Sequence, residues 1–458
     1  MKRREFLGWS GAGIGASLGT SWLAATNAAP LKAGVIGEPA REVPIVAEAD
    51  VVVCGAGPAG VTAAIAAARE GAKTHLLELH GCLGGIWTSG ALSWILDHAN
   101  KKGFMLELLD RLAAREALTL ADKRTPTNAY DIEVMKAVLE HLCVEAGVRL
   151  QLHTRVCAAV KDRQGRLSHV VTESKSGREA FAAKVFVDCT GDGDLGALAG
   201  CGFDLGHPET GRMQPMSLMA VIGGLRAEEV AEFFRDDDRI EWAKPKDALR
   251  REMERGGHSP SYNKPTLFRI RDDLFVLMAN HEYEVNGTDA RDVTGATLRA
   301  RRELHQLIDA LRSLGGVWRN MRIVATGDQI GVREGRRLHG HYTVSTDDLR
   351  EGRRHPDAVC RVTFPIDVHA TDPGKGKGIE RAAFRARPFD IPLRALIARN
   401  VQGLMMAGRC ISGDFVAHSS YRVTGNAVAM GEAAGKTAAV AAMSGRLPQA
   451  VSIDELHA

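Results

Sequence analysis

The apolar residues change their spacing several times along the chain, and the first change is the sharpest. The run Val51-Val52-Val53-Cys54 is continuous and mostly β-branched, which is typical of a buried strand. A glycine-rich turn follows at 55–60, and the small apolar residues of 61–68 favour a helix. A second apolar strand is expected at 74–78. The pattern therefore predicts a strand–turn–helix–strand unit near the beginning of the chain.

Later segments repeat both periods. Helical spacing predicts helices at 103–120, 130–146, 292–314 and 425–442, and strand patterns lie at 148–156, 167–173, 180–187 and 403–406. The last strand and helix return to the small apolar residues of the first unit, so we expect them to complete the sheet that begins at residue 50. Residues 204–400 carry more charge and proline, which indicates an inserted domain. The predicted fold class is α/β, with a Rossmann-like nucleotide domain and an α+β insertion.

Composition narrows the function classes. The chain has 458 residues, of which 45% are hydrophobic and 25% charged, as in globular enzymes of two or three domains. The formal net charge of +3 is too small to indicate nucleic-acid binding. None of the eight cysteines forms C-x-x-C, which argues against a redox disulfide, a haem attachment site or a zinc ribbon. The aspartates in the segment V-D-C-T-G-D-G-D-L lack EF-hand spacing, so no metal site is predicted.

The amino terminus reads as an export signal. Paired arginines at Arg3 and Arg4 precede a weakly apolar, glycine-rich stretch that ends in small residues near Ala29. Residues 1–29 resemble a bacterial twin-arginine signal peptide, and the alternative is a short amphipathic or disordered terminus. No later stretch reaches the ~18 apolar residues of a membrane span. We therefore expect a soluble mature protein in the periplasm or another extracytoplasmic compartment, with the twin-arginine machinery as a partner and 30–49 as a linker.

The glycine turn has the form G-x-G-x-x-G and lies between a strand and a helix, which is the context of a dinucleotide-binding loop. Gly55 allows the tight turn, Gly57 lets a pyrophosphate approach the backbone, and Gly60 lets helix and strand pack closely. The loop between them is made by Ala56, Pro58 and Ala59. Glu78 ends the second strand, where a carboxylate binds the ribose and repels a 2′-phosphate. The alternative is an ordinary βαβ unit with a glycine turn.

Several motifs together resemble a known family. They are V-V-V-C-G-A-G-P-A-G, G-C-L-G-G-I-W-T-S-G, V-D-C-T-G-D-G-D-L, G-V-R-E-G-R-R, G-L-M-M-A-G-R-C-I-S and A-H-S-S-Y-R-V-T-G-N-A-V-A-M-G-E-A-A-G. Their order and spacing resemble the FAD-dependent oxidoreductases of the glutathione-reductase-like flavoprotein class, from about residue 48 to 444. The resemblance implies an FAD-binding domain split into 50–203 and 401–445. The inserted substrate or cap domain would be 204–400, and 446–458 a C-terminal tail.

The same resemblance implies where FAD binds. The pyrophosphate would lie on the glycine loop at 55–60, and the adenosine ribose on Glu78. The remaining contacts would come from Gly84, Gly85, Val156, Thr190, Gly191, Asp192, Gly408, Arg409 and Asp414. The N-terminus of the last helix would lie near the flavin ring, where its dipole favours negative charge.

Three residues of the A-H-S-S-Y-R-V segment are candidates for catalysis. His418 is the predicted base, because an unperturbed imidazole titrates near neutral pH. Arg422 is predicted to bind a substrate carboxylate or oxyanion through its planar fork, and Tyr421 to donate a hydrogen bond. The alternatives are a histidine held by neighbouring backbone and a packed core aromatic. Arg333 and Glu334 are interpreted as a structural ion pair rather than substrate contacts.

These observations predict an exported FAD-dependent oxidoreductase that transfers a hydride between a small organic substrate and bound FAD, with an unknown electron acceptor. One alternative is an NAD-dependent Rossmann dehydrogenase. A second is a non-catalytic or electron-carrying flavoprotein subunit of a complex.

Overall fold

The computed structural model describes residues 34–122, 125–235, 241–374 and 376–456. The predicted export signal at 1–29 lies outside these ranges. The chain divides into two compact units, Met1–Glu42 and Val43–Ala458. In the first unit the described residues, 34–42, contain no helix or strand.

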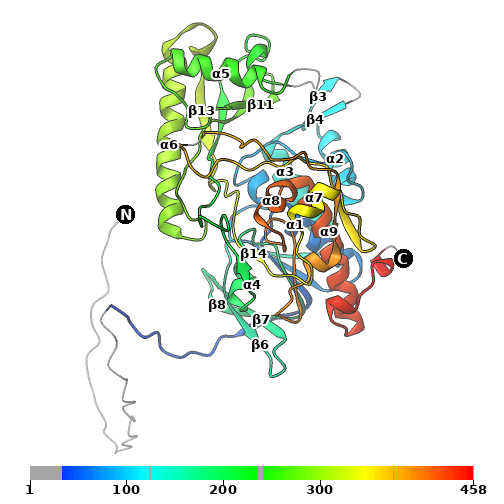
Figure 1. Cartoon of the computed structure of the whole chain (residues 1–458). Coiled ribbons are helices and arrows are strands. Elements are labelled where there is room, and N and C mark those ends of the chain that lie inside the picture. Colours follow the sequence, from blue (N-terminus) through cyan, green and yellow to red (C-terminus); the bar gives the residue numbers. More distant parts are fainter. Residues whose placement is uncertain (1–33, 123–124, 236–240, 375, 457–458) are drawn as a thin grey trace, which may run out of the picture. The chain divides into compact units, whose positions relative to one another are not determined.

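A seven-stranded sheet forms the core of the second unit (Figure 1). Its strands follow the order β5-β2-β1-β8-β7-β6, and β17 pairs with β8 beside this path. The bounds are β1 Ile45–Cys54, β2 Thr74–Leu77, β5 Arg149–Gln151, β6 Arg155–Lys161, β7 Leu167–Ser174, β8 Gly177–Asp188 and β17 Leu404–Met406. Strands β5, β2, β1, β8 and β17 are parallel, whereas β7 and β6 extend the sheet as an antiparallel meander.

Strand β8 joins the two halves of the chain. Its first part pairs with β7 in antiparallel fashion, from Ala182 back to Gly177, and its last three residues pair with β17 in parallel. Helix α1 (Pro58–Arg69) follows β1 and packs along helix α9 (Thr424–Ser444). The prediction that the C-terminal strand and helix complete the first sheet is therefore confirmed.

A second, antiparallel sheet has the order β11-β12-β10-β13. The strands are β10 Met219–Gly223, β11 Thr266–Arg271, β12 Leu274–Met278 and β13 Arg322–Thr326, and the nearby helices are α5 Lys244–Arg255 and α6 Ala290–Ser313. Figure 1 shows α5 and α6 on one side of this sheet. Alternate residues separate its two faces: Leu267, Phe275 and Leu277 belong to a core with α5 and α6, whereas Phe268 and Val276 belong to the main core. The second sheet is therefore buried on both faces.

The remaining elements connect or cover these sheets. They are α2 Phe104–Ala113, β3 Leu118–Asp122, β4 Thr125–Tyr130, α3 Ile132–Glu145, α4 Asp194–Leu198, β9 Phe203–Asp204, β14 Arg337–Leu338, α7 Thr346–Glu351, β15 Ala358–Val362, β16 Phe389–Pro392 and α8 Phe415–Tyr421. Short 3-10 turns lie at Gly85–Trp87, Ala231–Phe233, Gly316–Trp318, Leu393–Leu396, Pro448–Ala450 and Asp454–Leu456. Within the described ranges, no helix combines the length and apolar composition that a membrane crossing requires.

Three predicted boundaries are wrong. The helix expected at 103–120 ends at Ala113, because the chain reverses through Glu116, whose φ is +54°, and then enters β3. The strand expected at 148–156 is two strands, since His153 at φ +52° interrupts the extended backbone between β5 and β6. Strand β1 begins at Ile45, inside the segment predicted as a linker.

Candidate active site

The glycine loop between β1 and α1 has the geometry that its sequence predicts. Gly55 has φ +91°, and an added Cβ would lie 2.5 Å from the Cys189 carbonyl oxygen. A Cβ on Gly60 would lie 1.8 Å from the Gly55 carbonyl oxygen, so the helix could not pack on the turn. A Cβ on Gly57 would meet no atom within 4 Å. Two glycines therefore serve the fold, and Gly57 borders open space where a phosphate group fits.

The N-terminus of helix α1, with the positive end of its dipole, borders the open space at Gly57. Its N-cap is Gly57, which supplies no side-chain hydrogen bond, and Pro58 and Ala59 are buried in the first turn. No acidic residue lies in that turn. The backbone amides of the first turn and the positive end of the helix dipole suit a pyrophosphate.

Glu78 is buried at the end of β2 beside the loop. Its carboxylate accepts hydrogen bonds from the Ala56 amide, at 2.5 Å, and from the His80 amide, at 2.8 Å. The Thr154 amide donates to the Glu78 carbonyl at 2.8 Å, which brings the half-buried Val156, two residues further on, close to this strand end. A carboxylate has further lone pairs that can accept ribose hydroxyls.

Distant segments meet on the glycine loop. Gly84 and Gly85 have φ +104° and +52°, and a Cβ on Gly85 would lie 3.0 Å from the Gly57 Cα. Gly408, which follows β17, has φ +90°, and its Cβ would lie 3.3 Å from that of Ala59. The glycines that the family resemblance assigns to one cofactor are therefore brought together.

The turn after β8 lies beside the turn after β17. Thr190 donates to Asp188 at 2.7 Å and accepts from the Asp194 amide at 2.8 Å. Arg409 donates to Asp192 at 2.9 Å, and an added Cβ on Gly191 would lie 2.6 Å from the Arg409 guanidinium. Burial raises the pKa of Asp188 to about 6, despite these bonds. The ion pair of Arg409 and Asp192 connects the turn after β17 to the turn after β8, at the carboxyl ends of the two strands.

Asp414 caps α8 in the structure. Its carboxylate accepts from the Ala417 amide at 2.7 Å and from the Thr346 hydroxyl at 2.8 Å. Its contact with a ribityl chain stays a prediction.

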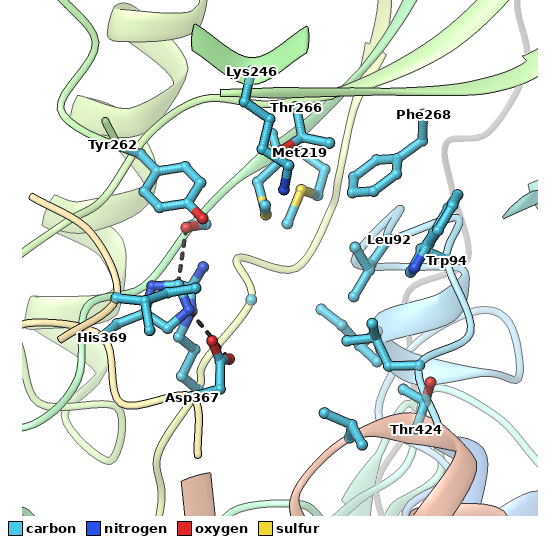
Figure 2. Close-up of a pocket in the computed structure, with 18 of the residues that line it drawn as sticks. Leu92, Trp94, Met219, Lys246, Tyr262, Thr266, Phe268, Asp367, His369 and Thr424 are labelled. Carbon is cyan, nitrogen blue, oxygen red and sulfur yellow. Dashed lines mark hydrogen bonds and ion pairs between the residues drawn. The ribbon is translucent and has the colours of Figure 1, made fainter. Parts of the chain in front are cut away.

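A cavity of about 530 Å³ opens between the second sheet and the N-terminal end of α9. Its wall includes Ile86 from the second glycine loop and Arg409, Val423 and Thr424 from the C-terminal segment. Figure 2 shows Leu92 and Trp94 on one side and Tyr262, His369 and Asp367 on the other. Most of the remaining wall is apolar or aromatic: Leu96, Met219, Phe233, Phe234, Trp242, Phe268, Met278 and Phe364.

The wall next to α9 fits a flavin ring. Val423 caps α9 without a side-chain bond, and no acidic residue lies in its first turn. The Thr424 hydroxyl oxygen is buried and has no hydrogen-bond partner among the described residues. A buried hydroxyl at the cavity wall is free to bond to a polar group of a ligand. Thr424 and the α9 amides are suited to hold the polar edge of a flavin.

Charged groups concentrate on the other wall. Arg333 donates to the Pro215 carbonyl at 2.7 Å and to the Ser217 hydroxyl at 2.9 Å. Arg422 donates to the Asp367 carbonyl at 2.7 Å and lies 3.2 Å from its carboxylate. Burial and the neighbouring Arg422 lower the pKa of Arg333 to about 10, which still leaves it charged at neutral pH.

Asp367 and Lys246 have strongly perturbed pKa values. Burial raises the pKa of Asp367, but His369, Arg422 and Arg333 outweigh burial and lower it to about 2. Burial lowers the pKa of Lys246 to about 7. Its amine lies 3.9 Å from the centre of the Trp242 ring, and its side chain extends into the cavity beside Met219 (Figure 2). Perturbed groups of this kind concentrate at functional sites.

The three predicted catalytic residues do not share this cavity. Arg422 lines it, whereas the described lining includes neither His418 nor Tyr421. His418 is fully buried, and burial lowers its pKa well below the usual value. Tyr421 donates to the Ile411 carbonyl at 3.1 Å in the core. The described lining of the cavity therefore includes the predicted anion-binding arginine but not the predicted base, although the Arg422 amide donates to the His418 carbonyl at 3.1 Å.

The predicted ion pair between Arg333 and Glu334 is wrong. Glu334 contacts Arg337 at 2.5 Å, and Arg333 faces the cavity.

Asp367, His369, Lys246 and Tyr262 were missed from the sequence. The segment F-P-I-D-V-H-A places two polar residues at alternate positions in an apolar run, which was the available signal for Asp367 and His369. No local motif marks Lys246 or Tyr262.

Comparisons with known proteins give a family. No curated protein matches the chain. Among solved structures, a geranylgeranyl bacteriochlorophyll reductase-like protein from Thermoplasma acidophilum is 14% identical, with 87% of this chain and 78% of that chain covered and a TM-score of 0.42. The myxobacterial halogenase CndH is 12% identical, with 90% and 78% covered and a TM-score of 0.46. Likenesses this distant carry no inference about the substrate.

The family model for FAD dependent oxidoreductases matches residues 50–458. This match spans the glycine loop, Glu78, the α9 end and the cavity, and it supports FAD over the NAD-dependent alternative. The chain belongs to the FAD dependent oxidoreductase family, and FAD is its cofactor.

Proposed function

We propose that the protein transfers a hydride between FAD and a small organic substrate that combines an apolar or aromatic body with a carboxylate. The observation that carries this proposal is the charge balance of the cavity. Of the described residues in its wall, Asp367 is the one carboxylate, and it pairs with Arg422. Arg333, on the same wall, donates to two neutral groups, a backbone carbonyl and a hydroxyl. An anionic ligand would compensate the buried positive charge of Arg333.

The shape of the wall supports the substrate class. Trp94 and Phe268 pack with ring centres 5.2 Å apart, and Met219, Met278 and Thr266 form one row across three paired strands. Such a surface suits a flat apolar body, while Arg333 and Arg422 suit a carboxylate.

FAD, when bound, supplies the hydride acceptor or donor. The residues of this chain bind and orient the substrate and handle its proton. Asp367 is ionised near neutral pH and lies between the arginines and His369, so it is the group placed to accept or return a substrate proton. A substrate carboxylate that neutralises Arg333 and Arg422 would raise the pKa of Asp367 and make it a stronger base.

The test is anaerobic mixing of the FAD-loaded protein with matched pairs of compounds, each an aromatic or branched carboxylic acid and its methyl ester. We expect the acid of at least one pair to change the flavin absorbance much faster than its ester. Equal rates for every acid and its ester would overturn the assignment of an anionic substrate. Flavin reduction only by a protein partner would favour an electron-carrying subunit instead.

We further propose that the protein is exported by the twin-arginine route and passes its electrons to an acceptor outside the chain. Arg3 and Arg4 support this proposal, because paired arginines are the signal for that route. The route carries folded proteins, which suits a protein that binds its cofactor before export. The order and spacing of the motifs quoted in the sequence likewise support a place in the glutathione-reductase-like class. Cell fractionation of the wild type and of an R3K/R4K variant tests export: the wild type should be periplasmic and the variant cytoplasmic.

A further inference from the structure

We propose that four side chains form a proton relay between the cavity and the surface: Asp367, His369, His281 and Tyr283. This inference rests on the proposed function, because it assigns a path to the proton that the substrate loses or gains.

The four side chains form one unbroken chain of contacts. The Asp367 carboxylate lies 3.3 Å from Nε2 of His369, and Nδ1 of His369 lies 3.1 Å from Nε2 of His281. Nδ1 of His281 lies 3.1 Å from the Tyr283 hydroxyl. Asp367 lines the cavity, as Figure 2 shows together with its contact to His369. Tyr283 is only half-buried, so the chain leads outward.

The contacts allow two complete hydrogen-bond directions. In one, Tyr283 donates to His281, His281 donates to His369, and His369 donates to ionised Asp367. In the other, every donor and acceptor is exchanged, with a protonated Asp367 at the inner end. Each imidazole is neutral in both states, because it donates through one nitrogen and accepts through the other. Burial lowers the pKa of His369 to about 4 and that of His281 well below its usual value, which suits this neutral form.

The backbone holds the two histidines in place. The His369 amide donates to the Gln214 side chain at 2.9 Å, and the His281 amide donates to the Ser261 hydroxyl at 2.8 Å. The Tyr262 ring packs on the His281 ring with centres 4.2 Å apart. Each histidine is two residues away from another member of the relay, in D-V-H at 367–369 and in H-E-Y at 281–283. The two segments lie side by side, with the two rings within hydrogen-bond distance.

The relay balances the proposed reaction. The resting direction, with Nε2–H on both rings, carries a proton inward. When a substrate is reduced, it gains a hydride from reduced FAD and a proton through Asp367. His369 passes its Nε2 proton to Asp367, His281 passes its Nε2 proton to Nδ1 of His369, Tyr283 passes its proton to Nδ1 of His281, and water restores the Tyr283 hydroxyl. The substrate gains two electrons, the cofactor loses them, and the chain is left in the second direction until its donors and acceptors turn over to the first. Substrate oxidation starts from the second direction, and the proton that Asp367 receives then moves outward to water by the reverse steps.

Nitrogen NMR of the FAD-loaded protein with labelled histidine tests the resting geometry without any turnover. We expect both His281 and His369 to be neutral at pH 7 with the proton on Nε2, and a coupling across the bond between their rings. A protonated ring, or a proton on Nδ1 of only one of the two, would break the chain and overturn the relay.

The Tyr283→Phe variant tests the outer end, with Tyr342→Phe as a matched loss of one hydroxyl, at a tyrosine that bonds to Asp348 instead. With an active substrate, we expect Tyr283→Phe to lower kcat about tenfold at unchanged KM and to enlarge the solvent deuterium isotope effect. The fall in kcat is smaller than the ~10²–10⁴-fold expected for loss of a positioned base itself. Equal kcat values in both variants would overturn the relay while the proposed function stands. If no acid reduces the flavin, the proposed function fails, and the NMR result still decides whether the hydrogen-bonded chain exists.

Discussion

At the scale of single residues, the buried ion pair of Glu334 and Arg337 is a stability element beside the cavity. Glu334 is buried, and its carboxylate accepts from Arg337 at 2.5 Å and from the Gln214 amide at 3.1 Å. Glu334→Gln leaves the Arg337 charge buried without its counter-charge, so we expect the free energy of unfolding to fall by about 3–5 kcal/mol. Urea unfolding measures the change. Glu145→Gln, which breaks an exposed pair with Arg111, should change it by less than about 0.5 kcal/mol. Similar losses in both variants would contradict this account.

Lys246 gives the proposed substrate binding a pH dependence. Its pKa, lowered by burial to about 7, means that the amine is protonated below pH 7 and loses its charge as the pH rises through 7. We therefore expect aromatic carboxylates to bind more tightly below pH 7 than above it, as followed by the flavin spectrum of the holoenzyme. Lys246→Met should flatten this step, whereas Lys184→Met, at a lysine paired with Asp50 on the surface, should keep it. A step that survives in Lys246→Met would assign it to another group.

The candidate site was predictable from the sequence only in part, because a motif marks only residues that are close together in the sequence. The glycine loop is read from consecutive residues, and each of its three glycines has a separate steric role. The cavity groups Asp367, Lys246 and Tyr262 come from three separate segments, and no short motif joins them. The contacts of Arg333 were likewise not predictable, because its partners Pro215 and Ser217 are distant in the sequence and the adjacent Glu334 is not its partner.

At the scale of elements, the contact of α1 with α9 depends on glycines. A Cβ on Gly431 would lie 2.2 Å from the Ala59 carbonyl oxygen, so Gly431→Ala must push α9 away from α1. We expect this variant to lose stability by about 1–3 kcal/mol and to bind FAD less tightly. Gly295→Ala in α6 is the control, since its Cβ meets only the end of the Arg299 side chain, at 3.2 Å. It should be neutral or stabilising, by up to about 1 kcal/mol. Thermal unfolding distinguishes the two, and equal losses would count against the packing argument.

The elements themselves were largely predictable because hydrophobic period marks them. Helices α1, α3, α6 and α9 and strands β2, β7, β8 and β17 lie where the pattern places them. The errors arise where backbone geometry overrides period. Glu116 and His153 adopt positive φ, which no side-chain pattern indicates, and so a helix ends early and one strand becomes two.

At the scale of the whole molecule, the candidate cofactor site is formed by segments from both ends of the second unit. The glycine loop and Glu78 come from the first part of the sheet, and Gly408 and the α9 end come from the last part. Strand β8 lies between β1 and β17 and pairs with both. A single FAD molecule bound across these segments adds a connection that the apoprotein lacks.

This arrangement predicts a separation between stability of the apoprotein and binding of FAD. Gly57 has φ −67° and ψ −174°, which a residue with a side chain can adopt, and its Cβ would meet no protein atom within 4 Å. Gly57→Val should therefore lower the stability of the apoprotein by no more than about 1 kcal/mol while its side chain fills the space of the pyrophosphate. Wild-type protein should gain about 2.7 kcal/mol at an FAD concentration a hundred times its Kd, whereas Gly57→Val should gain little at the same concentration. Gly60→Ala should differ from both, because its Cβ would collide with the Gly55 carbonyl and destabilise the apoprotein itself. Thermal unfolding across an FAD titration measures all three, and a Gly57→Val protein stabilised by FAD as much as the wild type would show that the pyrophosphate binds elsewhere.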